Sequence, residues 1–448
     1  MLKIYLDWNI ITHLKKDDED NTTLRKAFAK YCPYFIFPFS KAHLHDLGFG
    51  NKKCPGYSKD MHNLTTLCNT HLLEYDKEID SPYPYQCTPL EYIEKKEDEI
   101  ELFLSGFSKN KFNDFLSRND LNYTLLRGML THIRIKPMIL PLINKEVTNL
   151  AEMMDVIFEN LETLLTDSSI CAKVEEYVKK QYPDEYVKIK RSNYKTIFPL
   201  LNRISIEQAG KPLDDLLAVF HSEKNSMNHF ISLYLTLNLI GYHPDKKRGL
   251  LNIITDAIHA YYASKCDIFV TNDHALKEKV EALYYKMGIK TRVIEKNSIV
   301  KLMEEEAIAE FDLANFTKNI LPKLDLQCLG ETDSLYFKEL PFRFWGLFNY
   351  CAIATTNNSK RINVIFRLKI LPHDYVYYTE LYCFFECIKE ILTKDEIMQF
   401  DREYIEVFKS RKEDAIKNTH FKITRKGYVI HLMADPDSPV PLPMMVFS

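Results

Sequence analysis

Four aspartates stand where their carboxylates can meet and hold a divalent cation. Asp7 ends one apolar run, residues 2–7, and Asp273 ends another, residues 267–273. Each run predicts a buried parallel strand with a carboxylate at its C-terminal end. The carboxyl ends of parallel strands meet at the edge where open α/β sheets bind ligands. Because clustered carboxylates repel one another, the pattern predicts a site for Mg²⁺ or Mn²⁺.

The other two aspartates, Asp46 and Asp256, fall within expected helices. Asp256 lies in the middle of an apolar segment, residues 250–258, where an uncompensated buried carboxylate would be costly. A partner or a metal must therefore compensate its charge. For the other three a simpler interpretation stays open, with Asp7 and Asp273 as helix N-caps and Asp46 as a solvated helix residue.

Strands and helices must alternate in a fixed order to bring these aspartates together. The N-terminal segment predicts strands at 2–7 and 34–39 and helices at 10–15, at 22–31 and after the N-cap Ser40. The alternation returns after a break at 241–245, with helices at 250–263 and 274–287, the latter closed by Gly288, and strands at 267–270 and 291–294. Residues 1–50 and 245–305 therefore predict one discontinuous α/β core.

Two further regions are expected around this core. Residues 51–244 predict an enlarged helical insertion, because apolar residues recur at helical spacing between breaks; its expected helices include 89–104, 147–165 and 213–220. Residues 306–448 predict a separate α+β domain. Its expected elements are strands at 336–338, 342–353 and 362–370, a helical block at 378–418 and a hairpin at 421–432.

Composition narrows the class of protein. A chain of 448 residues predicts two or three domains, and its net charge of −3 provides no global basic field, so polyanion binding must use local patches. The ten cysteines include no CxxC pair and are expected to be reduced core thiols. No signal peptide or membrane-spanning run is evident, which favours a cytoplasmic protein. The absence of GxGxxG, Walker A and nucleophile-elbow motifs leaves nucleotide-driven and serine-hydrolase mechanisms without support.

Four segments resemble the acidic motifs of PIN-domain nucleases. They are Leu6-Asp7-Trp8-Asn9, Ser40-Lys41-Ala42-His43-Leu44-His45-Asp46, Asp256-Ala257-Ile258-His259-Ala260 and Val270-Thr271-Asn272-Asp273. The resemblance implies an α/β, PIN-like three-layer fold with a central parallel sheet. It also implies an endoribonuclease, dependent on Mg²⁺ or Mn²⁺, that leaves 5′-phosphate and 3′-hydroxyl ends on single-stranded or structured RNA. Two features depart from the family: the second acid is Asp46, where Glu is frequent, and residues 51–244 separate it from the third.

The resemblance assigns roles to individual residues. Asp7, Asp256 and Asp273 are the leading metal ligands for phosphodiester hydrolysis, and Asp46 is expected to hold a second ion or to orient water. Five polar residues are expected to support them: Asn9, His43, His259, Thr271 and Asn272. His43 and His259 each lie one helical turn from an acid, Asp46 and Asp256 respectively, and are expected to orient it. Either histidine can instead be satisfied by another polar group of the core.

Basic residues are candidates for contacting nucleic acid. The segment 179–203 interleaves cations with Tyr182, Tyr186, Tyr194 and Phe198, as a groove for a single strand requires. The expected phosphate contacts are Lys188, Lys190, Arg191, Lys195, Lys246, Lys247 and Arg248. An ordinary solvated basic surface is the alternative for both groups.

Other interpretations of the chain stay open. A zinc site at Cys54, His62, Cys68 and His71 lacks the ligand spacing of a known finger. A structure-specific DNA nuclease is the nearest enzymatic alternative to a ribonuclease. A catalytically silent RNA-binding or regulatory protein is the alternative from another class. The C-terminal domain is expected to contact a protein partner or a second copy of the chain.

Overall fold

The computed structural model describes most of the chain. The described residues are 1–16, 19–47, 56–94, 134–140, 145–149, 169–218, 225–245, 249–311, 328–329, 338–355, 362–368, 378–409, 418–425, 428–435 and 443–447. They divide into two compact units: a core unit of residues 4–17 and 37–296, and a C-terminal unit of residues 1–3, 18–36 and 297–448. None of the described helices is long and apolar enough to cross a bilayer.

The core unit contains a three-stranded parallel sheet in the order β1-β6-β7, formed by β1 (Ile4–Leu6), β6 (Ile268–Thr271) and β7 (Arg292–Glu295). Every residue of β1 and β6 is buried, as expected for strands covered on both faces. The registers Leu6↔Val270 and Thr271↔Glu295 align the carboxyl ends of the strands. The predicted α/β fold class is therefore confirmed at the level of a parallel sheet combined with helices.

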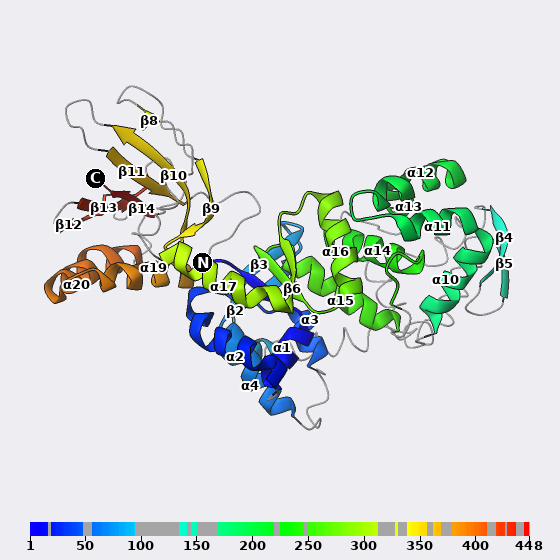
Figure 1. Cartoon of the computed structure of the whole chain (residues 1–448), viewed down its shortest axis with the longest axis horizontal. Coiled ribbons are helices and arrows are strands. Elements are labelled where there is room, and N and C mark those ends of the chain that lie inside the picture. Colours follow the sequence, from blue (N-terminus) through cyan, green and yellow to red (C-terminus); the bar gives the residue numbers. More distant parts are fainter. Residues whose placement is uncertain are drawn as a thin grey trace. The chain divides into compact units, whose positions relative to one another are not determined.

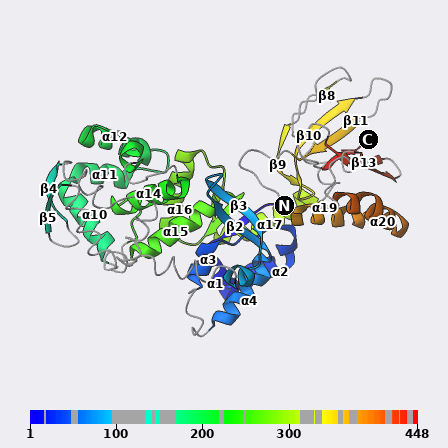
Figure 2. The ribbon, with the colours of Figure 1, turned by 180° about the vertical axis from the view of Figure 1, so that it is seen from behind.

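Helices follow the strands directly. α1 (Trp8–Lys15) begins after Asp7, and α16 (His274–Met287) begins after Asp273. α15 (Leu250–Ala263) and α16 have the predicted bounds, and Gly288 ends α16 in a left-handed conformation, φ +66°. α14 (Ser226–Leu239), α15 and α16 pack together close to β6 (Figures 1 and 2). A short helix, α3 (Lys41–Asp46), packs on α15 after its Ser40 cap.

The strand predicted at 34–39 is reduced to isolated bridges. A short helix, η1 (Cys32–Tyr34), occupies its start, and only the bridges Lys3↔Ile36 and Phe39↔Leu72 remain. Pro38, which has no N–H to donate, lies between the two bridging residues and interrupts a continuous ladder.

The expectation that residues 51–244 are helical is wrong in two places. β2 (His71–Asp76) and β3 (Ser81–Gln86) form one antiparallel pair, and β4 (Arg134–Leu140) and β5 (Lys145–Asn149) form another. The prolines of β3 disfavour a helix but are compatible with an edge strand. Strand β5 occupies the start of the helix expected at 147–165, the rest of which lies outside the described residues. Besides α14, the helices of this region include α4 (Tyr57–Cys68), α10 (Ile170–Gln181), α11 (Pro183–Arg191), α12 (Ile197–Ala209) and α13 (Leu213–Ala218).

The C-terminal unit is built on a second sheet that is mainly antiparallel, in the order β12-β13-β14-β11-β10-β8, with β9 also paired to β10 (Figure 1). The single strand predicted at 342–353 is wrong, because Trp345 and Gly346 adopt positive φ values and turn the chain between β9 and β10. The strands are β8 (Cys328–Leu329), β9 (Lys338–Phe344), β10 (Phe348–Thr355), β11 (Ile362–Arg367), β12 (His420–Arg425), β13 (Tyr428–Ala434) and β14 (Pro443–Phe447).

Helices complete the C-terminal unit. Aromatic side chains of α19 (Tyr378–Glu390) and α20 (Lys394–Phe400), including Phe384 and Phe400, share a buried core with the sheet. The Lys3 ammonium lies 3.3 Å from the fully buried Glu380 carboxylate on α19. The remaining helices are α2 (Glu19–Tyr31), α17 (Lys296–Phe311), η4 (Asp401–Ile405) and α21 (Glu406–Lys409).

Candidate metal centre

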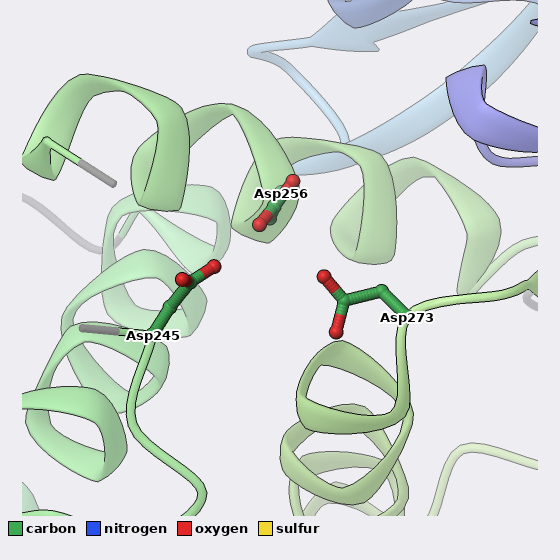
Figure 3. A group of neighbouring side chains, drawn as sticks. All are labelled: Asp245, Asp256 and Asp273. Carbon is green, nitrogen blue, oxygen red and sulfur yellow. The ribbon is translucent and has the colours of Figure 1, made fainter. Parts of the chain in front are cut away.

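Three carboxylates from three elements meet in the core unit. Asp245 lies in the turn after α14, Asp256 on α15, and Asp273 at the start of α16 (Figure 3). One oxygen from each lies within 4.8 Å of the others, and all three side chains are half-buried. We call these residues the carboxylate cluster. Asp256 and Asp273 were predicted as ligands from the sequence, whereas Asp245 was not.

Asp273 serves the fold as well as the cluster. Its Oδ1 accepts a hydrogen bond from the Leu276 backbone N–H at 3.0 Å, which caps α16. Its own backbone N–H donates to Thr271 Oγ1 at 3.1 Å. The N-cap interpretation of Asp273 therefore describes one oxygen correctly and does not account for its approach to Asp245 and Asp256.

The turn that carries Asp245 is held in an unusual conformation. Gly241 has φ +92°, and a Cβ there would come within 2.8 Å of Tyr186 Cε2, so only glycine fits without a shift. His243 also has a positive φ, +43°. Asn238 Oδ1 accepts the Asp245 backbone N–H at 2.9 Å and ties the turn to α14. The fold thus maintains local strain to place this carboxylate.

A buried cation accompanies the cluster. Lys279 on α16 is only 1% exposed, donates to Asn238 Oδ1 at 3.0 Å and lies 4.7 Å from the centre of the Tyr234 ring. Burial lowers its pKa, and the negative charges of Asp256, Asp245 and Asp273 oppose this shift. Lys279 therefore offsets part of the repulsion among the carboxylates.

A sequence signal for Lys279 did exist. The residue shares the buried stripe of α16 with Leu276, Val280 and Leu283, spaced by three and four positions. A lysine on such a stripe requires a buried acidic or polar partner.

Asp7 is hydrogen-bonded to neighbouring residues and is not part of the carboxylate cluster. Its side chain is 5% exposed, and its Oδ2 accepts from Asn9 Nδ2 at 2.6 Å and Thr271 Oγ1 at 2.7 Å. It occupies the N-cap position of α1 without making a side-chain capping bond, so the capping interpretation does not explain it. Burial raises its pKa, against the opposing charge of His259 and the Thr271 hydrogen bond.

The expected positioning residues link Asp7 to Asp273. Thr271 donates to Asp7 and accepts from the Asp273 backbone, so one hydroxyl contacts both strand-end acids. Asn9 donates to Asp7 while its Oδ1 accepts the Asn272 backbone N–H at 3.3 Å. Only the Asn272 backbone takes part in this linkage.

Asp46 pairs with His259, although the helical spacing suggested Asp256 as the partner of that histidine. His259 Nε2 donates to Asp46 Oδ2 at 2.8 Å, and its Nδ1 lies 2.9 Å from the Tyr5 hydroxyl. Burial lowers the pKa of His259, but the Asp46 hydrogen bond and the charges of Asp46, Asp7 and Asp256 raise it above its ordinary value. Burial raises the pKa of Asp46, but His259 and the other nearby histidines lower it below its ordinary value. Each partner therefore shifts the pKa of the other toward its charged form.

His43 completes this arrangement as a neutral imidazole, not as a partner of Asp46. Its Nδ1 accepts the Ser40 backbone N–H at 3.1 Å, which leaves Nε2 to donate to the Leu6 carbonyl oxygen at 2.8 Å. Burial, together with the nearby charge of His259, lowers its pKa to about 3. The Tyr5 hydroxyl lies 2.7 Å from Ser40 Oγ. We call Tyr5, Ser40, His43, Asp46 and His259 the histidine network.

The cations of α11 that are expected to contact nucleic acid lie in two different environments. Lys188 and Arg191 line a cavity of about 440 Å³ together with Arg203 of α12. Neither Lys188 nor Arg191 has an acidic partner in the described part of the chain. Lys190 instead lies 3.2 Å from Glu175, while remaining 36% exposed.

The aromatic side chains of residues 179–203 are not all placed where a base could stack on them. Lys195 lies over the Tyr194 ring at 5.4 Å, and that ring contacts Tyr285. Phe198 is buried and belongs to the core. Lys246, Lys247 and Arg248 lie outside the described residues, so their expected phosphate contacts stay predictions.

The proposed zinc ligands do not form a described site. Cys54 lies outside the described residues, His62 is exposed and Cys68 is buried. Over the part of the chain that the structure describes, the carboxylate cluster is the one group of acids, histidines or cysteines whose ligand atoms converge. No protein-family model, curated protein or solved structure matches the chain.

Proposed function

We propose that the protein is an endoribonuclease, dependent on Mg²⁺ or Mn²⁺, with a PIN-like core. One observation carries the proposal: the oxygens of Asp245, Asp256 and Asp273 approach within 4.8 Å of one another, with Asp273 just after the C-terminal end of β6. The reaction and the RNA substrate are inferred from the four motifs that resemble those of PIN-domain nucleases. They imply products with 5′-phosphate and 3′-hydroxyl ends.

The donor set suits a hard divalent cation. Carboxylate oxygens are the protein ligands that Mg²⁺ and Mn²⁺ prefer. Three such groups held together repel one another, and a divalent cation bound between them would relieve that repulsion. Asp245, Asp256 and Asp273 would hold the ion, which when bound lowers the pKa of water and neutralises charge on the phosphate undergoing hydrolysis.

The chain's other residues fix the acids in place. Thr271 and Asn9 orient the Asp7 carboxylate and join it to the turn before α16. His259 and Asp46 tie α15 to α3 by a charged hydrogen bond. The role of Asp7 as a metal ligand stays a proposal from the resemblance, and its carboxylate is held by Asn9 and Thr271. Asp46 positions His259 in this scheme, and its role as a ligand of a second ion stays a proposal from the resemblance.

A comparison of variants tests the proposal. Wild type, Asp256→Asn and Asp245→Asn are assayed on labelled single-stranded RNA with Mn²⁺ and with EDTA. Asp215→Asn is the control, because Asp215 is an exposed acid of α13 in the same unit. We expect cleavage by wild type and Asp215→Asn with Mn²⁺ only, and strong loss in the other two variants.

Other outcomes identify the alternatives. Equal cleavage by all four proteins would refute the assignment. Faster cleavage of branched DNA than of RNA would favour the structure-specific DNA nuclease. An absence of both cleavage and Mn²⁺ binding at millimolar concentration would favour a silent RNA-binding or regulatory protein.

A further inference from the structure

A pocket of about 280 Å³ borders the carboxylate cluster. It is lined by Lys190, Tyr242, His243, Pro244, His274 and Ala275. Asp245 directly follows Pro244, and Asp273 directly precedes His274. The two turns that supply carboxylates to the cluster therefore also form walls of the pocket.

The walls combine flat rings with a cation. The rings of His243 and His274 meet nearly edge to face with centroids 5.8 Å apart, and the Tyr242 ring packs against His243 at 4.7 Å. Lys190 reaches the same pocket from α11. Rings that can stack a base, beside a cation that can contact a phosphate, are the components of a single-strand nucleic-acid site.

The pocket is held in shape before any ligand enters. Glu278 on α16 lies 3.9 Å from His243 Nε2 and 3.8 Å from His274 Nδ1, so one carboxylate is near both imidazoles. His243 keeps its positive φ in the turn described above. The Tyr242 hydroxyl is buried and has no hydrogen-bond partner among the described residues. An unsatisfied buried hydroxyl of this kind is costly.

We propose that this pocket binds one nucleotide of a single-stranded RNA next to the bond that is cleaved, with its base against His274 and His243 and its phosphate at Lys190. The inference rests on the proposed ribonuclease function. The volume lies just below the range of about 300–1,000 Å³ typical of pockets for larger ligands, which suits one nucleotide. A base must leave its stack to enter, so the substrate is single-stranded at this position.

Helix α11 also gives the strand a path away from the pocket. Lys190 lines the small pocket, whereas Lys188 and Arg191 of the same helix line the 440 Å³ cavity. Cations on successive positions of one helix can follow a phosphate backbone that carries no sequence information.

Equilibrium binding separates this inference from the proposed function. The full chain is titrated into a short labelled single-stranded RNA and into a matched duplex, in EDTA so that cleavage does not contribute. The variants are His274→Ala, whose side chain is 71% exposed, and Lys190→Gln. The controls are His62→Ala and Lys290→Met, exposed residues of the same unit outside the pocket. Mn²⁺ binding is measured on every protein by calorimetry.

We expect wild type to bind the single strand more tightly than the duplex. His274→Ala should weaken single-strand binding by about 5- to 150-fold, the range for removing one base-stacking side chain. Lys190→Gln should weaken it less, and both should bind Mn²⁺ like wild type. Single-strand affinities of both variants equal to those of the controls would overturn the inference, as would a preference for the duplex. Pocket-dependent RNA binding without Mn²⁺-dependent cleavage would uphold the pocket and refute the proposed nuclease.

Discussion

The carboxylate cluster and the histidine network contain aspartates from the same predicted set, yet the fold treats them in opposite ways. In the network, Asp46 receives a charged hydrogen bond from His259, and His259 reaches Tyr5 through its other nitrogen. In the cluster, Asp245, Asp256 and Asp273 bring their oxygens within 4.8 Å of one another. The network satisfies its charges within the protein, whereas the cluster concentrates like charges.

This difference separates positioning from binding. Asp46 already accepts a strong hydrogen bond from the buried His259, and a metal bound at Asp46 would have to compete with that bond. Convergent carboxylates are destabilised by repulsion, and a divalent cation relieves it. We therefore expect the cluster to control metal binding and the network to control stability.

The largest expected effect is on catalysis. Asp256→Asn should lower kcat/KM for RNA by at least about 100-fold. Losing a residue that only supports a metal ligand costs up to about 100-fold, and Asp256 is proposed to be a ligand itself. Asp46→Asn, which keeps the shape of the paired side chain, should lower it less. Steady-state kinetics with Mn²⁺ measure both. A larger loss in Asp46→Asn than in Asp256→Asn would reverse the roles assigned to the two regions.

Metal should stabilise the fold through the cluster alone. At a free Mn²⁺ concentration 100 times Kd, the expected gain in the free energy of unfolding is about 2.7 kcal/mol. The thermal unfolding temperature of wild type and of Asp46→Asn should rise with Mn²⁺, and that of Asp245→Asn should not. A metal-dependent rise that survives in Asp245→Asn would count against the cluster.

Breaking the network should affect stability even without metal. Asp46→Ala leaves Nε2 of the buried His259 without its hydrogen-bond partner, and should lower the free energy of unfolding by about 1.5–3 kcal/mol. Urea titrations in EDTA measure this loss. Asp215→Ala serves as the control, and equal stability of the two variants would show that the pair contributes nothing.

A further effect is a gradual dependence of stability on pH. The pKa of His43 is lowered to about 3 in the folded protein. Between about pH 6.5 and pH 3, the His43 imidazole is therefore protonated in the unfolded chain and neutral in the folded chain. Stability should fall on acidification across this window, by up to about 1.4 kcal/mol per pH unit.

His43→Gln retains a side chain that can cap α3 and should reduce this slope in urea titrations from pH 4 to 6. His259 has the opposite sign: its raised pKa adds stability below about pH 6.5 that is lost as pH rises through the folded value. An unchanged slope in His43→Gln would contradict the neutral, buried state assigned to His43.

Local signals explain what the sequence could predict. The apolar stripes of α15 and α16 and the glycine at 288 define those helices without knowledge of their neighbours. Asp256 stood out because a carboxylate interrupts an apolar segment. Both are properties of one short stretch of chain.

Tertiary packing explains what could not be predicted. Asp245 reaches the cluster only because α14 packs on α15 and α16 and because Asn238 fixes its turn. His259 and Asp46 are 213 positions apart, so helical spacing pointed to the wrong partner for His259. Two left-handed residues, Trp345 and Gly346, divided one apparent strand into a hairpin. No local feature of the sequence favoured any of these arrangements over its alternatives.

Calorimetric titration of Mn²⁺ into wild type, Asp245→Asn, Asp46→Asn and Asp215→Asn tests the central claim most directly. Asp245 is decisive because the geometry of the cluster, and no motif, places it there. The account predicts saturable binding by wild type, Asp46→Asn and Asp215→Asn, and a loss of at least about 10-fold in affinity in Asp245→Asn. Binding that is unchanged in Asp245→Asn, or lost in Asp46→Asn alone, would contradict it.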